Sequence, residues 1–180
     1  MASVGRPIIS GSKQVLELLE LFGLTLTYLF SGRRERGAVM RQMFEINAFG
    51  TMRVLRALLP MMTSGGTVVN LSSTLAARPR PGAALYAATK GAVGNLTKGM
   101  ATDWARHGLQ CNAIAPGYFD TPLNKALVEN PEFCRWLEER TPQGRWGRVE
   151  ELAGACVFLC SDAASFVNGH VLDGGITARL

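Results

Sequence analysis

Several classes of protein are excluded by what this sequence lacks. Its four cysteines include no Cys-x2-Cys pair, and its two histidines do not stand at zinc-ligand spacing from them, so no metal site is expected. The apolar stretch over residues 15–30 is interrupted by Glu17 and Glu20. It is also shorter than the roughly 20 residues that a membrane-spanning helix needs. We therefore expect neither a zinc site nor a membrane segment.

A broad basic surface and a signal peptide are missing as well. The net charge of +5 is concentrated around Arg33, Arg34 and Arg36, whereas a nucleic-acid-binding surface needs a wider basic patch with aromatic side chains among the cations. Because no signal peptide is recognisable, the cysteines are expected to stay reduced. These absences predict a cytoplasmic protein that does not bind nucleic acid.

The elements that the sequence does contain alternate between strand and helix. With 180 residues, 47% of them apolar, and 20 glycines, the chain has the composition of one α/β domain. Alternating strands and helices predict a parallel sheet with right-handed crossovers. Helices are expected over residues 38–62, 84–107, 121–140 and 149–160, and strands over 66–72, 109–115 and, shortened, 170–173. Pro116 and Gly117 end the middle strand at its carboxyl end, the edge where ligands bind in open α/β sheets.

The most informative pattern is Ser-x12-Tyr-x3-Lys, formed by Ser73, Tyr86 and Lys90. Tyr86 and Lys90 are four residues apart in an expected helix, so both side chains project from one face. A lysine ammonium beside a phenol favours the phenolate, which predicts a lowered pKa for Tyr86 and a tyrosine suited to general acid–base catalysis. Ser73 follows a β-branched run, and its hydroxyl can bind a substrate oxygen at the strand end.

A purely structural interpretation of these residues stays open. Tyr-x3-Lys alone often arises by chance, so Tyr86 could be a half-buried aromatic residue and Lys90 a solvated helix residue. The surrounding order favours the catalytic interpretation: a strand, a serine, a loop with two prolines and then a helix rich in small residues.

On these residues, the sequence resembles the short-chain dehydrogenase/reductase family. The matching pieces are MFEINAFGTMRVLRALLPMM, GGTVVNLSS, YAATKGAVGNLTKGMATDWARHGLQCNAIAPGYFDTP and SDAASFVNGHVLDGG, which span about residues 40–180. The stretch APGYFDTPLNKALVENPEFCRWLEERTPQGRWGRVEELAGACVFL resembles the gluconate 5-dehydrogenase branch of that family.

The resemblance implies a set of functional residues. The implied catalytic residues are Asn47, Ser73, Tyr86 and Lys90. The implied cofactor is NAD or NADP, bound by Tyr86, Lys90, Pro116, Gly117 and Thr121. In the family, the asparagine holds a water that relays protons to the lysine. Simpler roles stay open, because Asn47 could cap or kink its helix and Thr121 could be an N-cap.

The family's phosphate-binding turn is missing from this sequence. Family members begin with a strand, a TG-x3-G-x-G turn and a helix whose N-terminus binds the cofactor pyrophosphate. Here residues 1–40 are atypical: 13–22 favour an amphipathic helix, 24–30 alternate like a strand, and neither matches the family. We therefore expect a single domain, N-terminally truncated, with residues 41–180 as the catalytic part. The expected fold is a Rossmann-like parallel sheet with helices on both faces, and cofactor binding should be weakened.

The segment before the last helix carries four further candidate residues. Arg145 and Arg148 could favour an anionic sugar acid, although solvent-facing arginines are the usual case. Trp136 and Trp146 are expected to pack in the core or an interface rather than to stack on a substrate.

Two hypotheses about function follow. The first is an NAD(P)-dependent oxidoreductase that acts on a secondary alcohol or ketone, with a sugar acid such as gluconate as the candidate substrate. The second is a catalytically silent chain that acts only through oligomer or partner contacts. The resemblance also predicts a dimer or tetramer, with Met100 or Trp104 in or near the interface.

Overall fold

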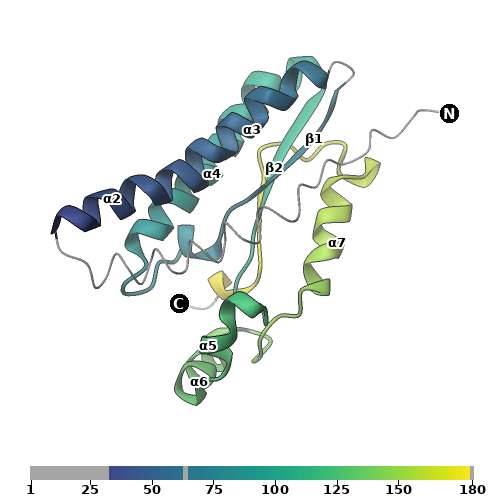
Figure 1. The fold of residues 1–180 in the computed structure, drawn as a ribbon. Helices are drawn as coiled ribbons and strands as arrows, with labels where there is room; N and C mark the ends of the chain where they lie inside the picture. Colours follow the sequence, from purple (N-terminus) through teal and green to yellow (C-terminus); the bar gives the residue numbers. More distant parts are fainter. Residues whose placement is uncertain (1–32, 63–64, 179–180) are drawn as a thin grey trace.

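The fold is described by a computed structural model over residues 33–62 and 65–178 (Figure 1). The helix expected over 13–22 and the strand expected over 24–30 lie outside the described residues. Within the described ranges, no helix is long and apolar enough to cross a membrane.

Three parallel strands form the sheet, in the order β1 (Gly66–Leu71), β2 (Leu109–Ala115) and β3 (Val171–Asp173). β2 lies in the middle, and six of its seven residues are buried, as expected for an apolar strand that is covered on both faces. Val68 of β1 pairs with Cys111 of β2, and both belong to the larger of the two core clusters among the described residues. The predicted parallel α/β sheet is therefore confirmed.

Helices cover both faces of this sheet (Figure 1). One face carries α2 (Arg33–Phe44), a π-helix (Glu45–Phe49), α3 (Gly50–Leu58) and α4 (Ala84–Trp104), and the other carries α7 (Glu150–Leu159). On the first face, Leu55 of α3 and Met100 of α4 are buried with Val68 and Cys111. The expected helix over 38–62 is thus present, but a π-helical turn interrupts it.

Buried polar pairs fix α4 against its neighbours. The Asn70 side-chain amide donates to Thr97 Oγ1 at 2.9 Å. The same Thr97 hydroxyl donates to the Val93 carbonyl, one turn earlier in α4, at 2.8 Å. Gly108 then ends the helical segment with a φ of 72°, a left-handed conformation that favours glycine. The chain enters β2 directly afterwards, as the sequence predicts.

The carboxyl edge of the sheet is covered by α5 (Lys125–Val128) and α6 (Pro131–Arg140), which follow β2 (Figure 1). Asn130 begins α6, because its side chain accepts hydrogen bonds from the backbone N–H groups of Glu132 and Phe133. Gly117 passes so close to β3 that a Cβ at this position would lie 2.8 Å from the Gly174 carbonyl oxygen. Single 3₁₀ turns occupy Leu59–Met61, Thr74–Ala76, Ala105–His107, Pro122–Asn124, Asp162–Ala164 and Ile176–Ala178.

Candidate active site

A cavity of about 260 Å³ opens at the carboxyl edge of the sheet. Its walls come from the end of β1, the first turns of α4, the loop after β2 and the segment around α5. The sequence-predicted residues that line it are Ser73, Tyr86, Lys90, Pro116, Gly117 and Thr121. The structure therefore brings together six of the seven residues implied by the resemblance.

Ser73 lies just beyond the end of β1. Its backbone is extended, with φ −161° and ψ 150°, and its Oγ accepts a hydrogen bond from the Leu75 N–H at 3.2 Å. The Ser73 side chain lies close enough to the Tyr86 hydroxyl to lower the Tyr86 pKa. The two hydroxyls that the sequence pattern placed on one cleft thus lie near each other in the cavity wall.

Tyr86 stands in the first turn of α4, partly buried. Burial raises the pKa of its phenol above the ordinary value of 10.0, more than the hydrogen bond with Ser73 lowers it. The sequence-based expectation of a lowered Tyr86 pKa is therefore wrong for this structure. Desolvation disfavours the phenolate, so Tyr86 is a protonated group at neutral pH.

Lys90 lies one helical turn after Tyr86, and only 5% of its surface is exposed. Its Nζ donates to the Leu71 carbonyl oxygen at 2.9 Å and lies 5.8 Å from the Tyr86 ring centroid. Burial lowers the Lys90 pKa from 10.5 to about 8, so the ammonium form still predominates at pH 7. Lys90 is thus a buried cation beside the phenol rather than a solvated helix residue.

Asn47 is the one implied catalytic residue that does not line the cavity. It is buried in the π-helix, where its Nδ2 donates to Thr89 Oγ1 at 2.8 Å. Thr89 Oγ1 in turn donates to the Tyr86 carbonyl at 2.8 Å. Asn47 therefore holds the α4 turn that carries Tyr86 and Lys90, one layer behind the cavity.

Thr121 is the sole buried side chain within 33–62 and 65–178 whose polar atom lacks a hydrogen-bond partner. Its Oγ1 belongs to a residue of the cavity wall, and its side chain makes no N-cap hydrogen bond to the following turn. A buried hydroxyl in a cavity wall with an unmet hydrogen bond is a ready contact for a polar ligand group.

Sequence reasoning missed two residues of the outer wall, Arg80 and Tyr118. Arg80 Nε donates to the Tyr118 hydroxyl at 3.1 Å. The Tyr118 ring makes edge contacts with Phe133, Trp136 and Trp146 at centroid distances of 5.5 to 5.9 Å. The two tryptophans thus pack with other rings, as predicted. In the sequence, only the stretches RPRP, which contains Arg80, and GYF, which contains Tyr118, could have indicated these two wall residues, and neither pattern is specific for a binding site.

Arg145 and Arg148 do not line the cavity. Both bind Glu151 on the surface instead. Arg145 donates to the two Glu151 carboxylate oxygens at 2.9 and 2.7 Å, and the Arg148 backbone N–H donates at 2.7 Å. These bonds lower the Glu151 pKa to about 2. The two arginines are therefore neutralised on the surface and are not candidates for binding an anionic substrate.

Comparisons with known proteins identify the same family. A family model described as enoyl-(acyl carrier protein) reductase matches residues 35–177. Gluconate 5-dehydrogenase of Gluconobacter oxydans (strain 621H) is 63% identical over 117 residues, which are 64% of this chain and 46% of that protein. 5-Keto-D-gluconate 5-reductase of Escherichia coli (strain K12) is 53% identical over 113 residues, or 62% of this chain and 44% of that protein.

A solved structure also resembles the fold. The crystal structure of a gluconate 5-dehydrogenase from Burkholderia cenocepacia J2315, in complex with NADP and tartrate, superposes with a TM-score of 0.76 at 46% identity. The match covers 84% of this chain and 59% of that one. The chain spans under half the length of the two curated relatives above. The extent of these matches shows that the chain belongs to the short-chain dehydrogenase/reductase family and resembles its gluconate 5-dehydrogenases.

Proposed function

We propose that the chain is an NAD(P)-dependent oxidoreductase that interconverts a secondary alcohol and a ketone. The observation that carries the proposal is that Tyr86 and Ser73 line one cavity, with the buried Lys90 ammonium beside the Tyr86 ring. A proton donor, a hydrogen-bonding hydroxyl and a cation around one cavity are the groups that reduction of a carbonyl requires.

The roles follow from the protonation states. Tyr86 is protonated at neutral pH, so in ketone reduction it gives its proton to the substrate oxygen as negative charge develops there. Ser73 donates a hydrogen bond to the same oxygen and orients it. The phenolate that remains is stabilised by the Lys90 ammonium, 5.8 Å from the ring centroid. Alcohol oxidation uses the same groups in reverse.

A nicotinamide fits the described residues at its reactive end. The Thr121 hydroxyl needs a hydrogen-bond partner, and Pro116, Gly117 and Thr121 lie in the same wall as Tyr86 and Lys90. We assign these residues to the nicotinamide and its ribose. When bound, the nicotinamide exchanges the hydride with the substrate carbon. The sequence offers no Gly-rich turn for the pyrophosphate, so we expect binding near the millimolar range rather than the micromolar range.

The substrate that we propose is a sugar acid such as gluconate. The two curated relatives described above are named for gluconate or 5-keto-D-gluconate, and the Burkholderia structure contains tartrate, also a hydroxy acid. The cavity wall around Arg80 and Tyr118 is compatible with an anionic polyol.

We also propose a homo-oligomer, a dimer or a tetramer. Phe49, Met52 and Val54 are 44, 47 and 50% exposed along the π-helix and α3, and such apolar surface favours self-association. Met100 was expected in or near the interface, but it is 5% exposed within one chain and belongs to the core. Sedimentation should show a dimer or larger, and a stable monomer at micromolar concentration would contradict this assembly.

The direct test is a titration of the purified chain with NAD(H) and NADP(H), followed by 5-keto-D-gluconate reduction at saturating cofactor. We expect weak binding and measurable reduction. Tight binding in calorimetry would mean that residues outside the described ranges supply a phosphate site. No turnover of any ketone with either cofactor would favour the catalytically silent alternative.

A further inference from the structure

A second cavity, of about 430 Å³, lies beside the active-site cavity. The two share Leu75, Arg80 and Tyr118 in their walls. Tyr118 is close enough to Tyr86 to influence its pKa. The two cavities therefore adjoin at the hydrogen-bonded pair Arg80 and Tyr118.

The second cavity is lined by three arginines and no carboxylate. Arg78 and Arg80 come from the loop before α4, and Arg140 is the last residue of α6. None of the ion pairs among the described residues includes any of the three. This distinguishes them from Arg145 and Arg148, which share one glutamate. The cavity therefore has an uncompensated positive charge that favours an anion.

Arg80 is held in place before any ligand arrives. It lies between Pro79 and Pro81, whose rings fix their own φ angles and stiffen the loop. Its Nε donates to the Tyr118 hydroxyl, and Nη1 contacts the Pro81 carbonyl oxygen at 3.4 Å. Its Nη2 makes no hydrogen bond to any described residue, so part of the guanidinium remains free to bind an anion.

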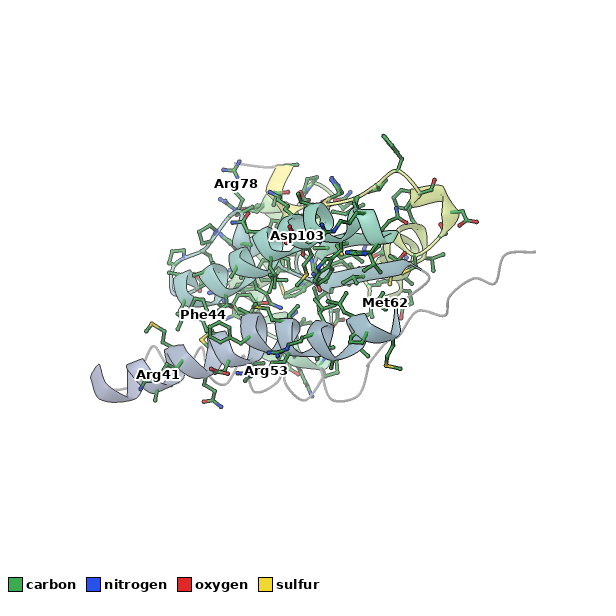
Figure 2. The ribbon with its side chains drawn as sticks, turned by 90° about the horizontal axis from the view of Figure 1, so that it is seen from above. Arg41, Phe44, Arg53, Met62, Arg78 and Asp103 are labelled. Carbon is green, nitrogen blue, oxygen red and sulfur yellow. The ribbon has the colours of Figure 1, made fainter. Side chains whose placement is uncertain are left out.

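Arg140 is positioned from the opposite wall. Its guanidinium carbon lies over the Trp136 ring, 5.7 Å from the ring centroid, a cation–π contact that uses none of the guanidinium N–H groups as hydrogen-bond donors. Burial raises the Tyr118 pKa above its ordinary value, and the positive charges of Arg80 and Arg140 partly offset that rise. Arg78 is exposed at the rim, and in Figure 2 it lies on the far side of α4 from Arg41.

We propose that the second cavity is a carboxylate subsite that binds the acid end of a sugar acid, with Arg80 and Arg140 as the principal contacts. The inference rests on the proposed function, in which Ser73 and Tyr86 hold the reacting oxygen of the same molecule. Planar guanidinium groups match the two oxygens of a carboxylate. A neutral sugar alcohol lacks that anion, so the subsite selects aldonic acids and their keto acids over uncharged polyols.

The subsite is tested by binding of D-gluconate, compared with neutral D-sorbitol, measured by calorimetry and ligand-detected NMR on the full chain. The test variants are Arg80→Gln and Arg140→Gln, and Arg135→Gln on the same helix is the matched control, because Arg135 is exposed and lines neither cavity. We expect each test variant to weaken gluconate binding about tenfold. Sorbitol binding should not change, and the control should match the parent chain.

Turnover measurements separate this subsite from the proposed function. If gluconate is oxidised, Arg140→Gln should raise its KM about tenfold with little change in kcat, because the contact serves ground state and transition state alike. An unchanged KM in both test variants overturns the subsite and leaves the oxidoreductase in place. Arginine-dependent gluconate binding without any turnover supports the subsite and overturns the oxidoreductase. Equal affinity of the parent chain for gluconate and sorbitol overturns the subsite.

Discussion

The two sides of the active-site cavity are held by different kinds of interaction. On the sheet side, buried hydrogen bonds fix α4 to β1: Lys90 Nζ donates to the Leu71 carbonyl, and Ser72 Oγ donates to the Lys90 carbonyl at 2.9 Å. On the other side, formed by the loop after β2 with α5 and α6 and called the lid side below, aromatic edges and partly exposed arginines surround Tyr118. Leu137 is the single buried residue of α6.

The difference separates chemistry from substrate choice. Buried hydrogen bonds are costly to disturb, so the groups that transfer the proton are fixed by the core itself. Ring contacts and surface charges tolerate exchange at lower cost, so the lid side can change its ligand preference without unfolding the sheet side. Substitutions on the sheet side should therefore reduce turnover or the free energy of unfolding. Substitutions on the lid side should reduce the affinity for substrate.

The largest effect is expected from Tyr86→Phe. The variant keeps the ring packed against Val39 and Met43 of α2 but removes the proton, so turnover should fall by about 10²- to 10⁴-fold. Ketone reduction at saturating cofactor measures this, and circular dichroism should confirm an unchanged fold. Turnover equal to that of the parent chain would remove Tyr86 from the catalytic set.

Lys90→Met should remove a pH dependence of stability. The folded-state pKa of about 8 lies below the ordinary 10.5, so between these values the unfolded chain binds the additional proton and stability rises with pH. The rise corresponds to about 3 kcal/mol over that window, because each pKa unit is worth about 1.4 kcal/mol. The raised pKa of the Cys111 thiol, about 11, acts in the opposite direction above pH 9 in both proteins.

Denaturant unfolding of parent and Lys90→Met chains at pH 7 to 9 isolates the Lys90 contribution, because the Cys111 thiol and the Tyr86 phenol, whose folded-state pKa values are raised, titrate mainly above this range. As the pH rises, the unfolding free energy of the parent chain should increase relative to that of the Lys90→Met chain. A difference that stays constant across this range would mean that Lys90 titrates normally in the folded chain.

Thr97→Val should destabilise the sheet side by about 1 to 3 kcal/mol, because it leaves the buried Asn70 amide with only the weak sulfur acceptor of Met100 at 3.9 Å. The double variant Asn70→Leu/Thr97→Val removes both partners and should recover much of the loss. Urea unfolding measures both. A single variant as stable as the parent chain would show that the amide has found another acceptor.

The smallest effect is expected from Glu151→Gln, at an exposed pair beside the lid. Its pKa of about 2 is depressed by Arg145 and Arg148, so it stabilises the fold above the ordinary 4.5 and loses this contribution as pH falls towards 2. Solvent and salt screen the effect. Melting curves from pH 5 to 2 should differ slightly between parent and variant at low salt only. Glu150→Gln, next to it in α7, is the control.

Much of the fold could be predicted from the sequence because its elements follow local rules. The predicted strand over 109–115 matches β2, and the predicted helix over 84–107 matches α4 with its 3₁₀ turn. Gly108, which ends the helical segment, and the pair Pro116–Gly117, which follows the strand, mark these bounds in the sequence itself.

The features that sequence reasoning missed depend on burial and on distant contacts. Helical spacing placed Tyr86 beside Lys90 correctly, but the depth of the Tyr86 phenol decides the direction of its pKa, and depth is a property of the packed chain. Arg140 and Arg80 are likewise far apart in sequence, and only the folding of α6 over the cleft places both around one cavity. Neither result follows from a local pattern.

The π-helix at Glu45–Phe49 sets which side chains of the long helix over residues 33–58 point in the same direction. Met43 and Leu55 are both buried, on the side of this helix that faces α4 and the sheet. In a regular α-helix, residues at this spacing would point about 120° apart, since each residue turns by about 100°. The wide turn absorbs one residue, which reduces the offset to about 20°. Deleting one residue from 45–49 should therefore keep both ends of the helix docked, while removing the irregular turn that carries Asn47.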